Sequence, residues 1–189
     1  YYSFGINPCC WSKVFKKELL EQCLYPVTPK VKIGEDAAFT YPCLLAAESL
    51  AYVDGCLYHY RNNAQSMTAA FDPHLTETIF IPLDILRTYF DTDKRALFAQ
   101  YQMYAAYLLQ LWVRNQASLD CDLDRKRMRQ SCARVCQNQE LRALLASVPG
   151  ALPRQVAVAV RAVQQQKPGQ LYMLIKAWNL YYKLRNGRA

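Results

Sequence analysis

The sequence has no long apolar run, no Cys-x-x-Cys pair and almost no acidic residues in its last third. A membrane-spanning helix needs about 18 or more uninterrupted apolar residues, and no such run occurs, so none is expected. Cys121, Cys132 and Cys136 lack both a Cys-x-x-Cys spacing and a nearby histidine, which argues against a zinc site. No repeat of fixed period is present either.

A disulfide framework is not indicated, although the chain contains eight cysteines. Cys9 and Cys10 are adjacent, and Cys23, Cys43 and Cys56 stand alone on apolar stretches. A chain of 189 residues can bury a core without covalent cross-links. We therefore expect reduced cysteines and a cytoplasmic protein.

The chain begins Tyr1-Tyr2-Ser3-Phe4, without a methionine and without a charged leader before an apolar stretch. These residues do not form a signal peptide. We expect residue 1 to be the boundary of a fragment of a longer protein.

The composition is that of a folded globular chain, with 52% hydrophobic and 20% charged residues. The net charge of +8 is unevenly distributed. Residues 1–124 carry 10 Lys/Arg against 14 Asp/Glu, whereas residues 125–189 carry 13 against the single acid Glu140, a net of +12. This basic region predicts an anionic partner surface, which could be a membrane, nucleic acid or another protein.

The first 70 residues show mixed α and β patterns, bounded by turn residues. A hairpin is predicted where two alternating segments flank Asp54-Gly55. The expected elements are a strand over Cys9–Phe15, helices over Lys16–Gln22 and Glu35–Ala47, and hairpin arms over Ser49–Val53 and Cys56–Tyr60.

After Phe71 every segment has helical periodicity. The predicted helices run over Leu75–Phe90, Asp93–Gln116, Leu123–Gln137, Gln139–Ser147, Leu152–Gln166 and Gln170–Leu184. An aromatic stripe in the second of them predicts a buried core face; it comprises Tyr101, Tyr104, Tyr107, Leu108, Leu111 and Trp112. The predicted fold class is α+β, mostly α, with a boundary near residue 70 and a helical region over 71–189.

Three short patches occur in the first 70 residues. They are Trp11-Ser12-Lys13-Val14-Phe15-Lys16-Lys17-Glu18-Leu19-Leu20, Ile33-Gly34-Glu35-Asp36-Ala37-Ala38-Phe39, and Tyr58-His59-Tyr60-Arg61 followed by Ser66-Met67-Thr68. Their order and spacing resemble the second half of family 2 glycosyltransferases of the GT-A fold. In that family a Trp-x-Lys-Leu-(Phe/Tyr) strand leads to a Gly-Glu-Asp turn and helix, then to Tyr-x-Tyr-Arg and Ser-(Ile/Met)-Thr. The match covers residues 7–68.

The resemblance implies that residues 1–70 are the carboxy-terminal, acceptor-side part of a GT-A domain. The nucleotide-binding half would precede residue 1, so the chain alone is expected to be inactive. The intact enzyme would transfer a sugar from a nucleotide-sugar donor to a glycan or lipid-linked acceptor, as in bacterial surface polysaccharides or glycolipids. A divalent metal, commonly Mg²⁺ or Mn²⁺, would be held mainly by the missing half.

The Glu-Asp pair fits the chemistry of such an enzyme. In inverting transfer an acceptor hydroxyl attacks the anomeric carbon, and a carboxylate must take its proton. Gly34 permits a tight turn, and the acids then begin a helix whose dipole favours an ionised carboxylate. Adjacent helical residues point about 100° apart, so the two do not form a shared dyad. By resemblance Asp36 is the base and Glu35 its neighbour; the alternative is two acids that only stabilise the helix start.

Further substrate-binding residues are assigned by resemblance, each with a structural alternative. Arg61 and Ser66 would approach the diphosphate, for which a guanidinium is suited, although Arg61 could equally be a solvent-exposed arginine. His59 could reach a metal or the diphosphate, or be a hydrogen-bonded structural histidine. Lys13 could offset phosphate charge or lie on the surface, and Trp11 is assigned with it to the substrate site.

The segment Asp120-Cys121-Asp122-Leu123-Asp124 contains Asp-x-Asp twice. It follows the Glu-Asp pair instead of preceding it, and lies between predicted helices. We interpret it as a helix N-cap with acids at the positive end of the dipole. No metal ligand is assigned in this chain.

The carboxy-terminal residues 170–189 contain cations but no acid. The cations are Lys176, Lys183, Arg185 and Arg188, and an apolar stripe is formed by Leu171, Leu174, Ile175, Trp178 and Tyr182. Such a helix predicts peripheral contact with an anionic membrane; the alternative is that the stripe packs on neighbouring helices.

A rival function is a basic helical module that binds nucleic acid or a protein partner, supported by the net +12 of residues 125–189. No nucleic-acid-binding motif occurs there. The basic run Arg125, Lys126, Arg127 and Arg129 is interpreted as a solvated face. We expect no nucleic acid among the partners.

Overall fold

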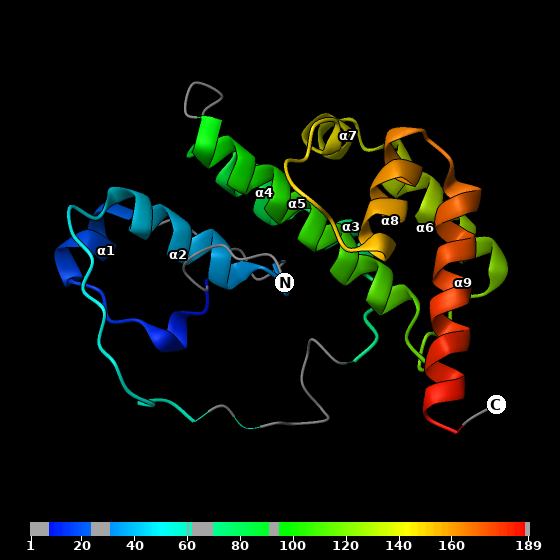
Figure 1. Cartoon of the computed structure of the whole chain (residues 1–189), viewed down its shortest axis with the longest axis horizontal. Coiled ribbons are helices and arrows are strands. Elements are labelled where there is room, and N and C mark those ends of the chain that lie inside the picture. The colour runs from blue at the N-terminus through cyan, green and yellow to red at the C-terminus, as the bar shows by residue number, and fades with distance from the viewer. Residues whose placement is uncertain (1–7, 24–30, 60, 62–69, 91–94, 188–189) are drawn as a thin grey trace.

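The computed structural model describes residues 8–23, 31–59, 61, 70–90 and 95–187, which form helices joined by turns and extended segments (Figure 1). The chain starts with a 3-10 helix, η1, Cys10–Ser12. The α-helices are α1 Lys17–Cys23, α2 Glu35–Ala46, α3 Leu75–Thr78, α4 Ile81–Leu86, α5 Arg95–Gln116, α6 Arg125–Gln137, α7 Gln139–Leu145, α8 Arg154–Gln164 and α9 Pro168–Arg185.

Helix α5 runs through the middle of the molecule and is the longest element of the described residues (Figure 1). It contacts α3, α4, α7, α8 and α9. Tyr101, Leu108 and Trp112 on its inner face are fully buried or nearly so, which confirms the predicted core stripe. Burying one large apolar side chain contributes about 1.5–3 kcal/mol, so this helix organises the fold.

The buried polar groups of α5 bind to other elements. The Tyr101 hydroxyl donates to the Leu83 carbonyl at 2.6 Å, and Gln102 Nε2 donates to the Leu144 carbonyl at 3.0 Å. Trp112 Nε1 donates to Thr76 Oγ1 at 3.0 Å. Because an unsatisfied buried polar group costs about 1–3 kcal/mol, these bonds fix how α3, α4 and α7 sit on α5.

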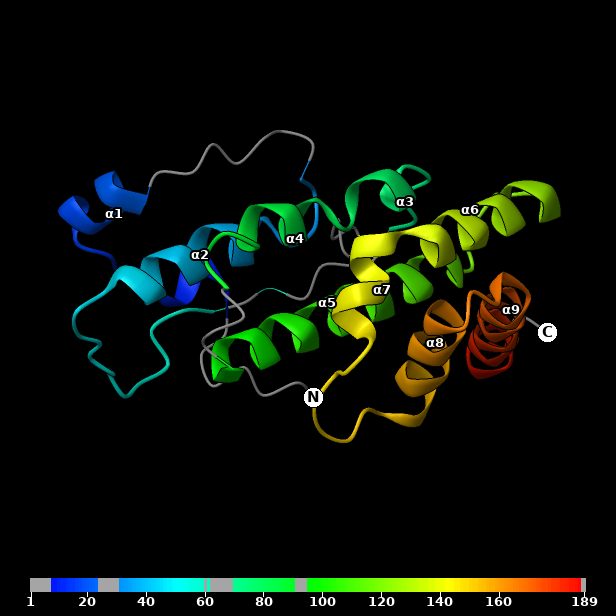
Figure 2. The same ribbon diagram turned by 90° about the horizontal axis from the view of Figure 1, so that it is seen from above.

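Helices α6, α8 and α9 pack together beside α5, and Figure 2 shows α8 and α9 side by side. Helix α8 buries its apolar face, including Val156, Val160 and Val163. Asn179 Nδ2 on α9 donates to the carbonyls of Ala117 and Ser118 at 3.2 Å each. This contact attaches the last helix to the end of α5.

The predicted helix over Leu75–Phe90 is two short helices, α3 and α4. Pro82 causes the division because it has no N–H to continue the hydrogen-bond ladder of α3. A proline is tolerated in the first turn of a helix, and Pro82 accordingly sits in the first turn of α4. The other predicted helices are confirmed, with ends shifted by a few residues.

The predicted α+β class is wrong: the described residues contain no strand and no sheet, and they form a helical bundle. Where a strand was expected over Cys9–Phe15, the chain forms η1 followed by extended backbone at Lys13. A strand pairs its backbone N–H and C=O groups with those of a neighbouring strand, and in the described chain no segment pairs with this one in that way. The acceptor-side GT-A sheet is therefore not present in this part of the molecule.

The predicted hairpin around Asp54-Gly55 is also absent; residues 47–59 form an open arc beside α2 (cyan in Figure 1). A two-residue type I′ turn needs positive φ at both central residues. Gly55 has φ 139°, but Gln166 is the only non-glycine residue with positive φ in the described chain, so Asp54 does not adopt the required conformation. The two arms therefore separate instead of pairing, and Tyr52 and Leu57 are 89% and 80% exposed.

Candidate active site

Helix α2 begins at a turn that requires glycine. Gly34 is its N-cap residue, with φ 90° and ψ 6°, a left-handed conformation that other residues rarely adopt. A Cβ at this position would lie 2.5 Å from Tyr104 Oη and 3.0 Å from Pro82 Cγ. Tyr104 also donates a 3.4 Å hydrogen bond to the Gly34 carbonyl. The start of the Gly-Glu-Asp helix is therefore held against both α4 and α5.

Glu35 and Asp36 occupy the first turn of α2. Since the N-cap residue is Gly34, neither acid is the N-cap residue. Burial raises the pKa of the Glu35 carboxyl; its own backbone amide opposes this, and the neighbouring Asp36 charge raises the pKa further. Both acids are thus half-buried in the first turn of α2, and for Glu35 the effect of burial outweighs the interactions that favour its anion.

The segment that contains η1 packs beside Asp36. Thr40, one turn after Asp36 on the same face of α2, donates to the Pro8 carbonyl at 2.7 Å, and its hydroxyl lies 3.5 Å from Cys10 Sγ. Burial raises the pKa of the Cys10 thiol. The hydrogen bond with Thr40 lowers this pKa, and the Asp36 carboxylate raises it. Cys10 is therefore a neutral thiol next to Asp36, not an activated nucleophile.

Lys13 lies at the edge of this arrangement. Its ammonium donates to the Cys9 carbonyl at 2.9 Å and to Ser12 Oγ at 3.0 Å, so the side chain folds back over η1. The positive charge is near enough to favour the thiolate form of Cys10, against the larger effect of burial. Lys13 thus brings a cation close to the start of α2.

The three sequence patches meet in space. Trp11 from the first patch stacks on Tyr58 from the third, with ring centroids 4.7 Å apart and planes inclined by 21°. Phe15 from the first patch contacts Phe39 from the second edge to face, at 5.7 Å. Segments more than 40 residues apart along the chain therefore gather around α2.

The remaining predicted substrate residues are less well placed. His59 and Arg61 are exposed, and in the described chain no hydrogen bond or ion pair joins either of them to Glu35 or Asp36. Ser66 lies outside the described residues. The structure thus brings Cys10, with Lys13 close to it, against Asp36, and it leaves His59 and Arg61 exposed.

A group of tyrosines between α2 and α5 was not predicted as part of the site. Tyr41 and Tyr104 are in edge-to-face contact at 6.0 Å, and Tyr104 and Tyr107 are 6.3 Å apart. Burial raises the pKa of Tyr104 far above its usual value, and the nearby Glu35 and Asp36 charges add to the shift. Thr40 could have been found from its i+4 spacing to Asp36, whereas no local pattern links Tyr104 to Gly34.

Comparisons with protein-family models, with curated proteins and with solved structures found no match for this chain. Functional assignment therefore rests on the geometry of the chain itself. In the described ranges no group of three or more His, Cys, Asp or Glu side chains is placed to hold a metal ion. The described side chains therefore form no metal site of their own.

The second acidic segment has a structural role. Asp124 is the N-cap of α6, and its side chain accepts a 2.7 Å hydrogen bond from the Arg127 backbone N–H. This bond lowers the pKa of Asp124, and the Arg127 guanidinium lies 3.8 Å from its carboxylate. The interpretation of the Asp-x-Asp segment as a helix cap is confirmed.

The apolar stripe predicted for the last helix faces inward. Leu171 and Ile175 are buried, and Leu174, Trp178 and Tyr182 are partly buried against the same core. The stripe thus packs on neighbouring helices. Across the described ranges, every helix is too short or too polar to traverse a bilayer.

Proposed function

We propose that this chain is part of an inverting glycosyltransferase that acts in the cytoplasm on a nucleotide-sugar donor. The acceptor would be a glycan or a lipid-linked sugar. The observation that carries the proposal is the contact between the three patches, through Trp11 with Tyr58 and Phe15 with Phe39 of α2. A chance likeness in sequence does not require the patches to meet.

The proposed reaction is one displacement with Asp36 as general base. The acceptor hydroxyl oxygen forms a bond to the anomeric carbon while the bond from that carbon to the diphosphate oxygen breaks, with inversion. The hydroxyl proton passes to a carboxylate oxygen of Asp36, and the electron pair of the broken bond leaves with the diphosphate. Asp36 lies half-buried in the first turn of α2, next to Glu35.

Neighbouring residues would orient the acceptor. Glu35 points away from Asp36 around the helix and can bind a second acceptor hydroxyl. The stacked Trp11 and Tyr58, which are 41% and 52% exposed, present an aromatic face to which a sugar ring could bind. Lys13, with His59, Arg61 and Ser66, would approach the leaving diphosphate.

The proposed chemistry uses the residues around η1 and α2 and requires no GT-A sheet in the described chain. Donor binding and a divalent metal are attributed to a part of such enzymes that residues 1–189 do not resemble. The described side chains do not form a site for that metal.

The test is acceptor-dependent release of nucleoside diphosphate by the natural protein. A panel of UDP- and GDP-sugars with Mn²⁺ is screened against oligosaccharide and lipid-linked acceptors. We expect release from one donor class, stimulated by one acceptor class. Calorimetry with residues 1–189 alone should show no micromolar binding of any donor.

Two results would contradict the proposal. If no donor gives acceptor-stimulated release, the chain does not belong to a sugar transferase. If residues 1–189 alone bind a donor at micromolar concentration, the donor site has been assigned to the wrong part of the protein.

A further inference from the structure

Helix α9 carries a second apolar stripe on the face opposite its buried one. Its members recur at helical spacing and point to solvent; they are Met173, Ala177, Leu180 and Leu184. Met173, Leu180 and Leu184 are 65%, 56% and 62% exposed, and Tyr181 at its margin is 56% exposed. We call this set the outer stripe.

A helix that is apolar on two faces is unusual at a water-exposed surface. Isolated exposed leucines are common, but several on one face indicate a surface that is covered in use. The inner face of α9 is already satisfied by the core through Leu171 and Ile175. In the described part of the chain, the outer stripe is therefore left exposed.

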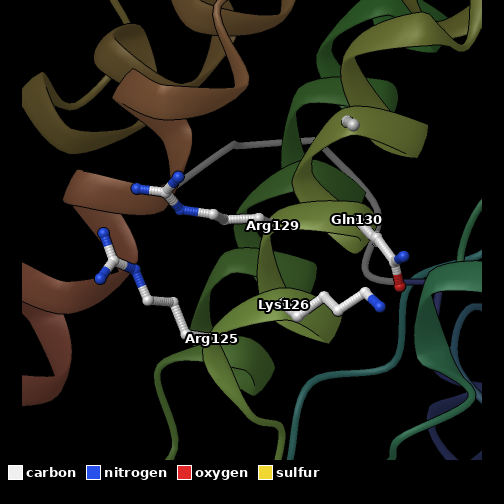
Figure 3. A pocket seen from close by; sticks show the side chains of 5 residues that line it. Arg125, Lys126, Arg129 and Gln130 are labelled. Carbon is white, nitrogen blue, oxygen red and sulfur yellow. The ribbon is translucent and has the colours of Figure 1, made fainter.

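Cations gather along one edge of the outer stripe. Lys176 and Lys183 lie on that edge of α9, and Arg125 and Arg129 extend toward it from α6 (Figure 3). The Arg129 guanidinium lies 5.2 Å, and the Lys176 ammonium 5.7 Å, from the centre of the Tyr172 ring. The tyrosine holds the two charges close together, which their repulsion alone would oppose.

Arg125 and Arg129 border an open hollow of about 510 Å³ on α6. Arg125, Lys126, Arg129, Gln130 and Ala133 line it. Within the described chain no ion pair neutralises Arg125, Lys126, Arg129, Lys176 or Lys183. Asp120, Asp122 and Asp124 precede α6 and oppose them, but the cations on this edge are more numerous.

We propose that the outer stripe of α9 and the adjacent basic hollow dock the protein on an anionic membrane surface. Lipid phosphates would bind Arg125, Arg129 and Lys176, while Leu180 and Leu184 enter the boundary between headgroups and acyl chains. The membrane-facing residues thus differ from the inner stripe that periodicity alone selected. The docking surface does not involve Asp36, so it is independent of the proposed transfer chemistry.

Charge and polarity favour this partner over two others. A second copy meeting the same surface would bring like charges together, since residues 125–189 carry 13 cations and one acid. Nucleic acid would use the cations, but it offers no apolar layer for a row of leucine side chains. An anionic bilayer satisfies both parts of the surface.

The experiment is co-sedimentation of the full 189-residue chain with vesicles. Wild type should bind vesicles containing phosphatidylglycerol, bind phosphatidylcholine vesicles weakly, and be released as salt rises. Leu180→Ser/Leu184→Ser should weaken binding at least about tenfold. Arg125→Gln/Arg129→Gln/Lys176→Gln should weaken it about 100-fold, as each cation near an anionic surface contributes roughly a factor of five.

Matched controls carry the same chemical changes elsewhere. Leu50→Ser/Leu57→Ser removes two leucines that are 61% and 80% exposed, and Lys16→Gln/Lys17→Gln/Lys32→Gln removes the same charge. Both should bind like wild type, and circular dichroism should show all variants folded, since the changed side chains are exposed.

The proposal is overturned if wild type binds neutral and anionic vesicles equally, or if the Leu180/Leu184 variant binds like wild type. Vesicle binding that the Arg125/Arg129/Lys176 variant loses and the Leu180/Leu184 variant keeps would show attraction to negative charge alone. The partner would then be a soluble polyanion such as nucleic acid. A dimer in sedimentation velocity that the leucine variant abolishes, without vesicle binding, would identify a second copy as the occupant.

Discussion

Replacing Gly34 by alanine should be among the most destabilising small changes in the chain. An L-residue at φ 90° costs about 1–2 kcal/mol in backbone strain. The new Cβ would overlap Tyr104 Oη and press on Pro82, and such overpacking costs about 1–3 kcal/mol. We therefore expect Gly34→Ala to lower the free energy of unfolding by roughly 3–4 kcal/mol.

Two variants separate these contributions. Gly150 has φ 80° and nothing within 4 Å of an added Cβ, so Gly150→Ala should show only the backbone strain of about 1–2 kcal/mol. In a Tyr104→Phe background the overlapping hydroxyl is gone, so Gly34→Ala should cost about 1–2 kcal/mol less than in wild type. Urea unfolding followed by circular dichroism measures all four values.

Equal losses in the free energy of unfolding for Gly34→Ala and Gly150→Ala would contradict a steric contribution at Gly34. The same contradiction would follow if Gly34→Ala lowered the free energy of unfolding equally in the wild-type and Tyr104→Phe backgrounds. Either result would mean that α5 does not press on the turn that positions Glu35 and Asp36.

Three further outcomes follow from the contacts. Folding favours protonated Glu35, so the free energy of unfolding should decrease as pH rises above 4.5, and Glu35→Gln should remove that part of the decrease in urea titrations. Asn179→Ala loses two hydrogen bonds and should lower the free energy of unfolding by about 1–3 kcal/mol, seen as a lower urea midpoint with an unchanged slope. In native thiol labelling followed by mass spectrometry, exposed Cys56 should react first. Cys132 and Cys136, whose pKa values burial raises to about 12 and about 11, should react only on unfolding; early labelling of either would contradict their burial.

The helical part of the fold could be predicted because its signals are local. The core stripe on α5 and the Asp124 cap of α6 each depend on residues within a few positions of one another. The strands could not be predicted in the same way, since alternation shows only that a segment could pair. Whether residues 47–59 do pair depends on a neighbour and on the φ of Asp54, neither of which periodicity specifies.

In the candidate site, too, the residues with local sequence signals could be predicted, and those placed by long-range packing could not. Gly34, Glu35 and Asp36 form the expected turn and first helical turn because glycine and the acids act within a few residues. Tyr104 contacts this turn although it lies 70 residues further along the chain. A pattern of nearby residues cannot predict such a contact. Helical periodicity also predicted one apolar stripe on α9, but the helix has two. Only the packing in the structure shows which of the two is buried.

The most direct measurement is the turnover number of the natural protein with Asp36→Asn, at saturating donor. A neutral amide cannot accept the acceptor proton, so turnover should fall at least about 100-fold with donor affinity and folding unchanged. Asp84→Asn, which alters another acid in the first turn of a helix, should transfer sugar at the wild-type rate. Transfer by Asp36→Asn at near the wild-type rate would contradict the assignment of Asp36 as the base.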